Sequence, residues 1–154
     1  MNSTLAILLG GGIFIILIVL AVALAAYIFL ALALMGMAKN KGIENAWLAF
    51  IPFGNMFILG KILGTMDLFG QKIEQPELVL PVVTLASAVL SAIPVLGQLI
   101  AIASMVITLM AYYQLVERYK QGSGALYVIL MIFVAPVGAY LLFTIRDNTP
   151  AMVE

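Results

Sequence analysis

Lys61 is the side chain whose position most suggests chemistry, because it lies inside the apolar stretch 43–64. A lysine near the middle of a bilayer costs about 2.5–3.5 kcal/mol on insertion scales. Its ammonium could there hold an anionic substrate, a lipid phosphate or a partner's carboxylate. The simpler alternative is a snorkelling lysine, whose ammonium reaches the headgroup level while its stem lies along apolar neighbours.

Asn55 lies directly after Pro52–Gly54, a combination that interrupts a helix. A helix that begins there leaves main-chain N–H groups exposed, and an asparagine side chain can cap them. The alternative is a polar ligand site made by the freed main-chain groups and Asn55, as in the broken helices of transporters. Trp47 precedes the break, and we expect it to anchor a short helix at the headgroup level.

Other charged side chains lie near the expected membrane boundaries. Glu44 is close in sequence to Lys39 and Lys41, and Glu117 adjoins Arg118. Surface pairing or solvation accounts for these groups more simply than catalysis does. Glu44 and Arg118 fall on the same expected face of the membrane, so both stay candidates for binding a ligand or a partner.

Small residues at helical spacing favour close packing between membrane helices. Gly60 and Gly64 form such a pair around Lys61, and Ser87 and Ser91 form another. A polar pore is the alternative role for the hydroxyl groups. Because residues 78–116 contain no charge at all, the sequence argues against ion conduction.

The composition indicates what surrounds these residues. Hydrophobic residues make up 65% of the 154 residues and charged residues 9%, against roughly 45–50% and about 25% in soluble domains. A chain this short has too little interior to hide that much apolar surface from water. The sequence therefore predicts a polytopic membrane protein.

The residue types also exclude several kinds of chemistry. Without cysteine and histidine, the chain has no thiolate nucleophile, no disulfide and no imidazole base or ligand. Seven basic and seven acidic residues provide no phosphate-neutralising surface for nucleic acid. The spans contain hydroxyl groups without a neighbouring base, and Asp67 and Asp147 lie outside them. We therefore expect no enzyme, no cofactor and no metal site.

Hydropathy predicts an all-α integral membrane protein, with residues 1–154 forming a single membrane domain. It would have four transmembrane helices. A broken helical hairpin, either interfacial or re-entrant, would lie between the first two. The spans are expected at about 12–34, 76–93, 98–119 and 125–145, and the hairpin at about 44–63.

Two local features qualify these spans. Gly10–Gly12 weaken the start of the first apolar run, so the residues before about Gly12 are expected to fray or to be exposed. Pro136 and Gly138 lie near the centre of the last span, where they predict a kink.

Orientation follows from the basic residues. The loop 38–77 and the loop after the third span hold six of the seven, and with four spans these loops share one side. The positive-inside rule makes that side cytoplasmic, which places the N-terminus and the C-terminus outside. Arg146 is the exception to this pattern.

Residues 38–64, AKNKGIENAWLAFIPFGNMFILGKILG, resemble a segment of small, uncharacterised bacterial multipass membrane proteins, mostly from Gram-positive cells. In that family a basic patch, Glu-Asn, Trp, Ile-Pro, Asn and Gly-Lys-Ile follow the first span. The matching positions here are Lys39, Lys41, Glu44, Asn45, Trp47, Ile51, Pro52, Asn55, Gly60, Lys61 and Ile62. The segment from Arg118 to the last span is similar more loosely. The resemblance implies a multipass protein of the bacterial cytoplasmic membrane and supplies no established activity.

Two functions follow as hypotheses. The first is a non-enzymatic accessory, assembly or scaffold subunit of a membrane complex, bound to another membrane protein or to its own copies in the lipid bilayer. The alternative is a small transporter or lipid-handling protein that uses the broken helix around Pro52–Lys61; an enzyme acting on lipids is the weakest reading. The candidate ligand- or partner-binding residues are Glu44, Asn45, Trp47, Asn55, Lys61 and Arg118, and the candidate packing residues are Gly60, Gly64, Ser87 and Ser91.

Overall fold

The computed structural model describes the main chain of residues 3–151 and the side chains of residues 10–151. Its elements are α1 Ser3–Asn40, the 3-10 helix η1 Ala46–Phe50, α2 Gly54–Leu63, β1 Met66–Leu68, β2 Gln71–Ile73, α3 Pro76–Leu90, α4 Leu96–Tyr119, α5 Gly124–Phe133 and α6 Ala135–Thr144. The predicted all-α class is confirmed. The two strands form only a short antiparallel hairpin, in which Asp67 lies opposite Lys72.

Two helices of the described chain are long and apolar enough to cross a membrane. They are Gly10–Asn40 within α1 and the whole of α4, Leu96–Tyr119. The other apolar helices are shorter, since α3 has 15 residues and α2, α5 and α6 have 10 each. The chain is therefore a helical protein with two candidate membrane-spanning helices.

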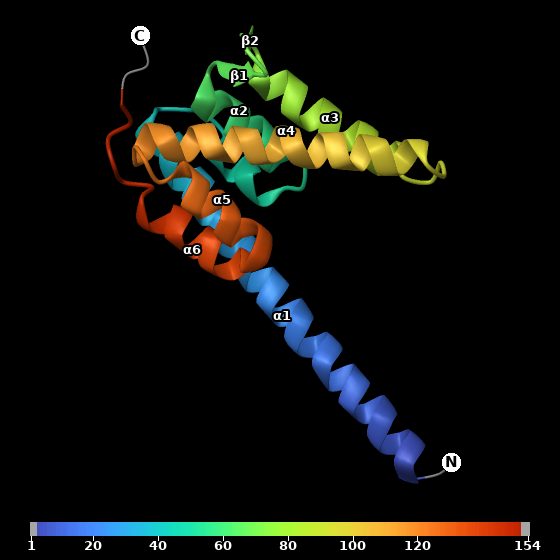
Figure 1. Ribbon diagram of the computed structural model, residues 1–154. Helices are drawn as coiled ribbons and strands as arrows, with labels where there is room; N and C mark the ends of the chain where they lie inside the picture. Colours follow the sequence, from blue (N-terminus) through green and yellow to red (C-terminus); the bar gives the residue numbers. More distant parts are fainter. Residues whose placement is uncertain (1–2, 152–154) are drawn as a thin grey trace.

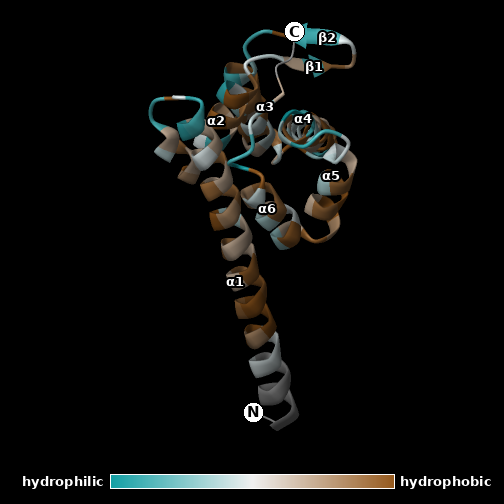
Figure 2. Cartoon of the chain, turned by 90° about the vertical axis from the view of Figure 1, so that its left-hand side faces the viewer, coloured by the Kyte–Doolittle hydropathy of each residue, from teal (hydrophilic) through white to brown (hydrophobic). Residues whose placement is uncertain are grey.

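The beginning of α1 was expected to fray or to be exposed. It is exposed at Gly10–Gly12 but does not fray there, because a helix bonds its own main-chain groups even where nothing packs on it. Every residue from 10 to 25 is exposed, whereas Leu34 and Met37 in the second half are completely buried. Figures 1 and 2 show this apolar first half projecting away from the rest of the fold.

The core lies where α2 is enclosed by the second half of α1, by α3 and by the last turns of α4. Ile58, Leu59 and Ile62 of α2 are buried against this group, together with Leu115 of α4. The predicted broken hairpin at 44–63 corresponds to η1 and α2, which are separated at Ile51–Phe53. Most of α2 is buried, so packing fixes its direction relative to α1 and α4.

The prediction of one kinked helix at 125–145 is wrong. Instead of one kinked helix, the chain breaks at Val134 and folds back, so that α5 and α6 lie side by side (Figure 1). A Cβ on Gly138 would lie 2.8 Å from the main-chain nitrogen of Met131, a proximity that a continuous helix does not allow. Pro136 explains the break, since its ring clashes with the carbonyl four residues earlier and it has no N–H to donate.

The segment after α6 returns to the end of α4. Asn148 Nδ2 donates to the Tyr119 carbonyl at 3.1 Å, and the Ala151 N–H donates to the Arg118 carbonyl at 2.7 Å. Asn40, at the end of α1, donates from Nδ2 to the Arg146 carbonyl at 3.1 Å. Residues up to Ala151 therefore lie at the same end of the bundle as the loop that follows α4, and not at the opposite end as predicted.

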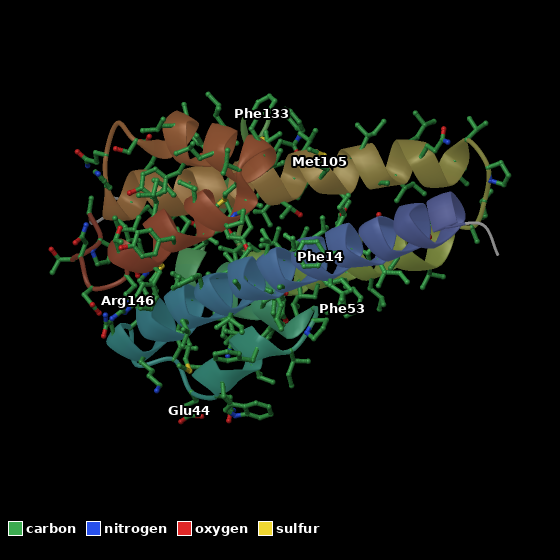
Figure 3. The ribbon with its side chains drawn as sticks, turned by 90° about the horizontal axis from the view of Figure 1, so that it is seen from below. Phe14, Glu44, Phe53, Met105, Phe133 and Arg146 are labelled. Atoms are coloured by element: carbon green, nitrogen blue, oxygen red, sulfur yellow. The ribbon has the colours of Figure 1, made fainter. Side chains whose placement is uncertain are left out.

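The second half of α1 is held against α6 as well. The Phe29 ring of α1 makes edge-to-face contacts with Tyr140 and Phe143 of α6, with centroids 5.6 and 5.8 Å apart. Figure 3 shows Arg146 at one end of the bundle and Phe133, at the tip of the α5–α6 hairpin, part-way along α4. The hairpin thus enters the bundle from one end and leaves by the same end.

Candidate functional site

The end of α2 carries the densest set of polar contacts in the described chain. A helix leaves its last carbonyls without intrahelical partners, and here two cations provide donors. Lys41 Nζ donates to the Ile62 carbonyl at 2.7 Å, and the Arg118 guanidinium donates to the carbonyls of Leu63 and, at 2.5 Å, of Thr65. Positive charge at this end also complements the helix dipole.

Three separate elements bring these groups together. Lys41 follows α1 in a turn, where its N–H still bonds to the Met37 carbonyl at 3.1 Å. Arg118 lies in the last turn of α4, and Gly64, whose φ of +68° suits glycine, directly follows α2. The end of α2 is thus the point at which α1 and α4 are joined by polar contacts.

A cavity of about 330 Å³ opens between the two cations. Its described lining includes Lys41, Arg118, Thr65 and the returning residues Pro150 and Ala151, but no carboxylate. Burial, and then the charge of Arg118, lower the pKa of the Lys41 ammonium below its ordinary value of 10.5. Two like charges beside one cavity make it a place where an anion would be stabilised.

Lys61 lines a different cavity, of about 410 Å³, on the other side of Gly64. Glu44 and Glu77 share this cavity with it. The Lys61 side chain is exposed, and its Nζ lies 4.8 Å from the centroid of the Phe57 ring. Because one cation faces two carboxylates here, this cavity is less suited to an anion than the cavity beside Lys41.

The other predicted binding residues lie apart from these cavities. Asn45 precedes η1 in the left-handed region with a φ of 58°, and its carbonyl accepts from the Leu48 N–H at 2.9 Å. Trp47 is 56% exposed on η1. Asn55 is buried in the first turn of α2 but makes no side-chain cap there, because Phe53 occupies the N-cap position. The expected capping role of Asn55 is therefore not what the structure shows.

The small residues proposed for packing lie at two helix contacts. Gly60 is pressed against the main chain of Pro76 and Glu77, so that any Cβ at this position would clash with the beginning of α3. Ser91 lies where α3 ends, and its main chain is close enough to Gly97 that a Cβ there would come within 2.8 Å of the Ser91 carbonyl oxygen. Gly64 has open space around it, and Ser87 is half-buried.

Sequence reasoning missed two groups. Lys41 counted only as a loop charge, although a basic residue just after a long helix is well placed to reach another helix's end. From the sequence alone Tyr112, near the end of the third expected span, suits an aromatic belt, yet its hydroxyl is buried and has no hydrogen-bond partner among the described residues. No signal in the sequence distinguishes a buried tyrosine from one at the membrane surface.

The described residues contain no group of three or more histidine, cysteine, aspartate or glutamate side chains that could hold a metal ion. Lys41, Arg118 and main-chain groups provide electrostatic and hydrogen-bonding interactions at this end of the bundle. No protein-family model matches this chain, and neither a curated protein nor a solved structure shows significant similarity to it.

Proposed function

We propose that the chain is a multipass protein of the bacterial cytoplasmic membrane that acts by binding, as an accessory or assembly subunit of a membrane complex. The membrane location is supported by the 65% hydrophobic composition and by the two long apolar helices. It is also supported by large exposed side chains such as Phe14, Val82 and Leu99, at 65%, 63% and 61% exposure. The bacterial source is what the resemblance over 38–64 implies.

The contacts at the end of α2 favour three crossings rather than the four expected from hydropathy. Lys41 after α1 and Arg118 at the end of α4 meet at one end of the bundle. If α1 and α4 both cross to that end, α3 must cross in the opposite direction between them. Its 15 residues span about 22 Å, so the turn after it completes the crossing. The α5–α6 hairpin would then be re-entrant, and η1–α2 would lie at the interface.

In this three-span arrangement Arg146 no longer departs from the positive-inside pattern. All seven basic side chains fall at the end of the bundle where α1, α4 and α6 end. The positive-inside rule makes that end cytoplasmic, with the N-terminus outside and Ala151 inside. The basic residues concerned are Lys39, Lys41, Lys61, Lys72, Arg118, Lys120 and Arg146.

Single-cysteine labelling tests this topology directly, because the chain contains no cysteine. Val95→Cys should react with a membrane-impermeant maleimide in intact cells, since Val95 lies in the exposed turn before α4. Lys72→Cys and Thr149→Cys should react only after the membrane is opened. Labelling of Thr149→Cys in intact cells while Lys72→Cys stays protected would restore the four-span arrangement.

The observation that carries the subunit role is the uncovered first half of α1. Its residues 10–25 are exposed on every side, and nothing lies within 4 Å of where a Cβ would be at Gly10, Gly11 or Gly12. Such a helix offers a partner helix a close approach that the rest of the fold does not use. The proposed partner is therefore a transmembrane helix, from another protein or from a second copy.

Native mass spectrometry of gently extracted protein tests this role. We expect a mass that includes a second polypeptide in fixed stoichiometry, and its loss in a Gly11→Leu variant. Ala103→Leu is the matched control, because Ala103 is exposed on α4. A wild-type protein that is only monomeric contradicts the proposal.

Lipid handling is a second candidate, favoured by the cavity between Lys41 and Arg118. Two cations and no carboxylate among its described lining residues suit a phosphate group. The lipid site proposed here therefore lies at Lys41 and Arg118, whereas the sequence suggested the broken helix around Pro52–Lys61. Thermal unfolding in micelles with added phosphatidylglycerol or phosphatidylcholine tests it: the anionic lipid should stabilise the wild type and lose its effect in Lys41→Gln. Equal stabilisation of both proteins excludes this site.

A further inference from the structure

Two cavities of opposite charge share Gly64, the residue that directly follows α2. The first, which we call the cationic cavity, lies between Lys41 and Arg118 and has a volume of about 330 Å³, with no carboxylate among its described lining residues. The second, which we call the acidic cavity, has a volume of about 410 Å³ and is lined by two glutamates and one lysine. Opposite charges on one ligand would therefore be stabilised on the two sides of Gly64.

At the boundary between the two cavities the chain carries glycines. Lys41 lines the cationic cavity, and the next residue, Gly42, lines the acidic cavity. A Cβ on Gly42 or on Gly64 would have no atom within 4 Å, so there is open space beside both glycines. A ligand can extend from one cavity to the other across them.

The charged groups of the acidic cavity come from three parts of the chain and are not paired with one another. Glu44 lies between α1 and η1, Lys61 lies in α2, and Glu77 lies in the first turn of α3. The described chain contains one ion pair, between Arg146 and Asp147, so neither carboxylate of the cavity is paired with Lys61. Two carboxylates and one ammonium leave this cavity with one net negative charge.

The cationic cavity can bind an anion without giving up its contacts to α2. Lys41 uses one N–H for a main-chain carbonyl at the end of α2, and the Arg118 guanidinium donates to two further carbonyls. An ammonium and a guanidinium each have more donors than these contacts use. The remaining N–H groups suit a phosphate, whose oxygens accept charge-assisted hydrogen bonds.

The wall of the acidic cavity indicates which kind of cation it suits. A primary ammonium has N–H groups that carboxylates accept, whereas a quaternary ammonium has none and is typically bound by aromatic side chains. No aromatic residue is present in the described lining of either cavity. A primary ammonium therefore fits this wall better than a choline group does.

Both cavities face the cytoplasmic headgroups in the topology proposed above, because Lys41 follows α1 and Arg118 lies in the last turn of α4. Figure 2 shows hydrophilic residues gathered at this end of the molecule, in contrast to the hydrophobic first half of α1. Each cavity is close to the lower limit of the range usual for ligand pockets, about 300–1,000 Å³. The pair of cavities therefore suits a headgroup rather than a whole lipid.

We propose that the two cavities together bind the phosphoethanolamine headgroup of a membrane lipid. Its phosphate accepts hydrogen bonds from Lys41 and Arg118, and its ammonium donates to the carboxylates of Glu44 and Glu77. The proposal rests on the lipid-handling function proposed above and specifies its ligand. That function needs only the phosphate, whereas this inference adds recognition of the ammonium.

Thermal unfolding of the full chain in uncharged micelles tests the proposal by titration with two lipids that have identical acyl chains. Phosphatidylethanolamine should bind about three- to tenfold more tightly than phosphatidylcholine, the range expected for two partly exposed ion pairs. The double variant Glu44→Gln/Glu77→Gln should lose this preference and keep its affinity for phosphatidylcholine. Lys41→Gln should weaken the binding of both lipids.

Glu74→Gln is the matched control, because Glu74 is exposed on the segment before α3 and lines neither cavity among the described residues. It should leave the preference for phosphatidylethanolamine unchanged. A preference that survives in Glu44→Gln/Glu77→Gln, or that Glu74→Gln abolishes equally, would overturn the assignment of the ammonium to the acidic cavity.

The remaining outcomes separate this inference from the lipid-handling function. Equal affinity for the two lipids, weakened for both in Lys41→Gln, would refute recognition of the ammonium and leave the phosphate site standing. Stabilisation by neither lipid would contradict both proposals. Water-soluble glycerophosphoethanolamine distinguishes a lipid from a free compound with the same groups: if it stabilises the protein as strongly as the lipid does at equal concentration, the membrane lipid is not the ligand.

Discussion

The side chains of Lys41 and Arg118 converge on one end of α2, where each donates to main-chain carbonyls. They come from the ends of the two longest helices, so this short helix joins α1 to α4. Both cations already have acceptors there, although no carboxylate lines the cavity between them among the described residues. Stability and any binding of anions therefore depend on the same two groups.

Replacement of Arg118 should loosen this junction. Arg118→Met removes the donors to two carbonyls, and we expect the free energy of unfolding to fall by about 2 kcal/mol. Unfolding by denaturing detergent, followed by far-ultraviolet circular dichroism in micelles, measures the change. Lys120→Met is the control, because Lys120 is exposed and its Nζ lies 5.8 Å from the centroid of the Tyr127 ring, so this substitution should shift the value by less than about 0.5 kcal/mol. Equal effects of the two substitutions would refute the role of Arg118.

The lowered pKa of Lys41 predicts a dependence of stability on pH. Burial and the charge of Arg118 lower this pKa below 10.5 in the folded protein. Between the lowered value and 10.5 the unfolded chain binds more protons than the folded one, so stability should rise with increasing pH. Unfolding measured between about pH 8 and pH 11 should show this rise, and Lys41→Gln should reduce it.

Arg118→Gln provides the second test of this electrostatic coupling. Removal of the neighbouring positive charge should raise the pKa of Lys41 towards its ordinary value. Nuclear magnetic resonance of the Lys41 Cε carbon, in protein labelled at lysine, follows that titration. An unchanged titration in Arg118→Gln would mean that burial alone accounts for the shift.

Gly60 and Gly11 should respond oppositely to the same substitution. Gly60→Ala places a methyl group against the main chain of Pro76 and Glu77, so we expect a loss of about 1–3 kcal/mol. Gly11 has open space around it within a helix, and Gly11→Ala should stabilise that helix by about 0.5–1 kcal/mol. Thermal unfolding of both variants in one detergent compares them. A tolerated Gly60→Ala would mean that α2 and α3 do not pack so closely.

Gln114 should control the opening of the strand hairpin. The Asp67 N–H donates to Gln114 Oε1 at 2.9 Å, and Gln114 Nε2 donates to the Asp67 carbonyl at 2.6 Å. Loss of both bonds in Gln114→Ala should speed hydrogen exchange at the Asp67 amide by about tenfold. Gln98→Ala, at an exposed position on α4, should leave that rate unchanged.

The helical class, the break around Pro52 and the helix boundaries near 76 and 119 follow from local signals such as hydropathy, proline and charge. The path of residues 125–145 could not be predicted from such signals, because one long helix and two short helices folded back on each other have the same hydropathy. Pro136 marked the place of the break but not its angle. The angle is set by contacts with α1, such as Phe29 on Tyr140, which no local pattern encodes.

The candidate site was predictable only in part, for a related reason. Glu44 and Lys61 share a cavity and are close along the chain, so proximity in sequence carried some information. Lys41 and Arg118 are far apart in the sequence and come together only in the folded chain. The sequence of a helix end that needs hydrogen-bond donors does not indicate which distant cations will provide them.

The pairing of α1 with α6 has a consequence for biosynthesis. The second half of α1 is completed by a helix near the other end of the chain, through Phe29 on Tyr140 and Phe143 and through Asn40 on the Arg146 carbonyl. In the membrane placement proposed above, this face of α1 stays unpaired during translation until residue 146 has left the ribosome. The interval is a window in which an insertase or chaperone could hold α1, and in which premature pairing with another helix would trap the protein.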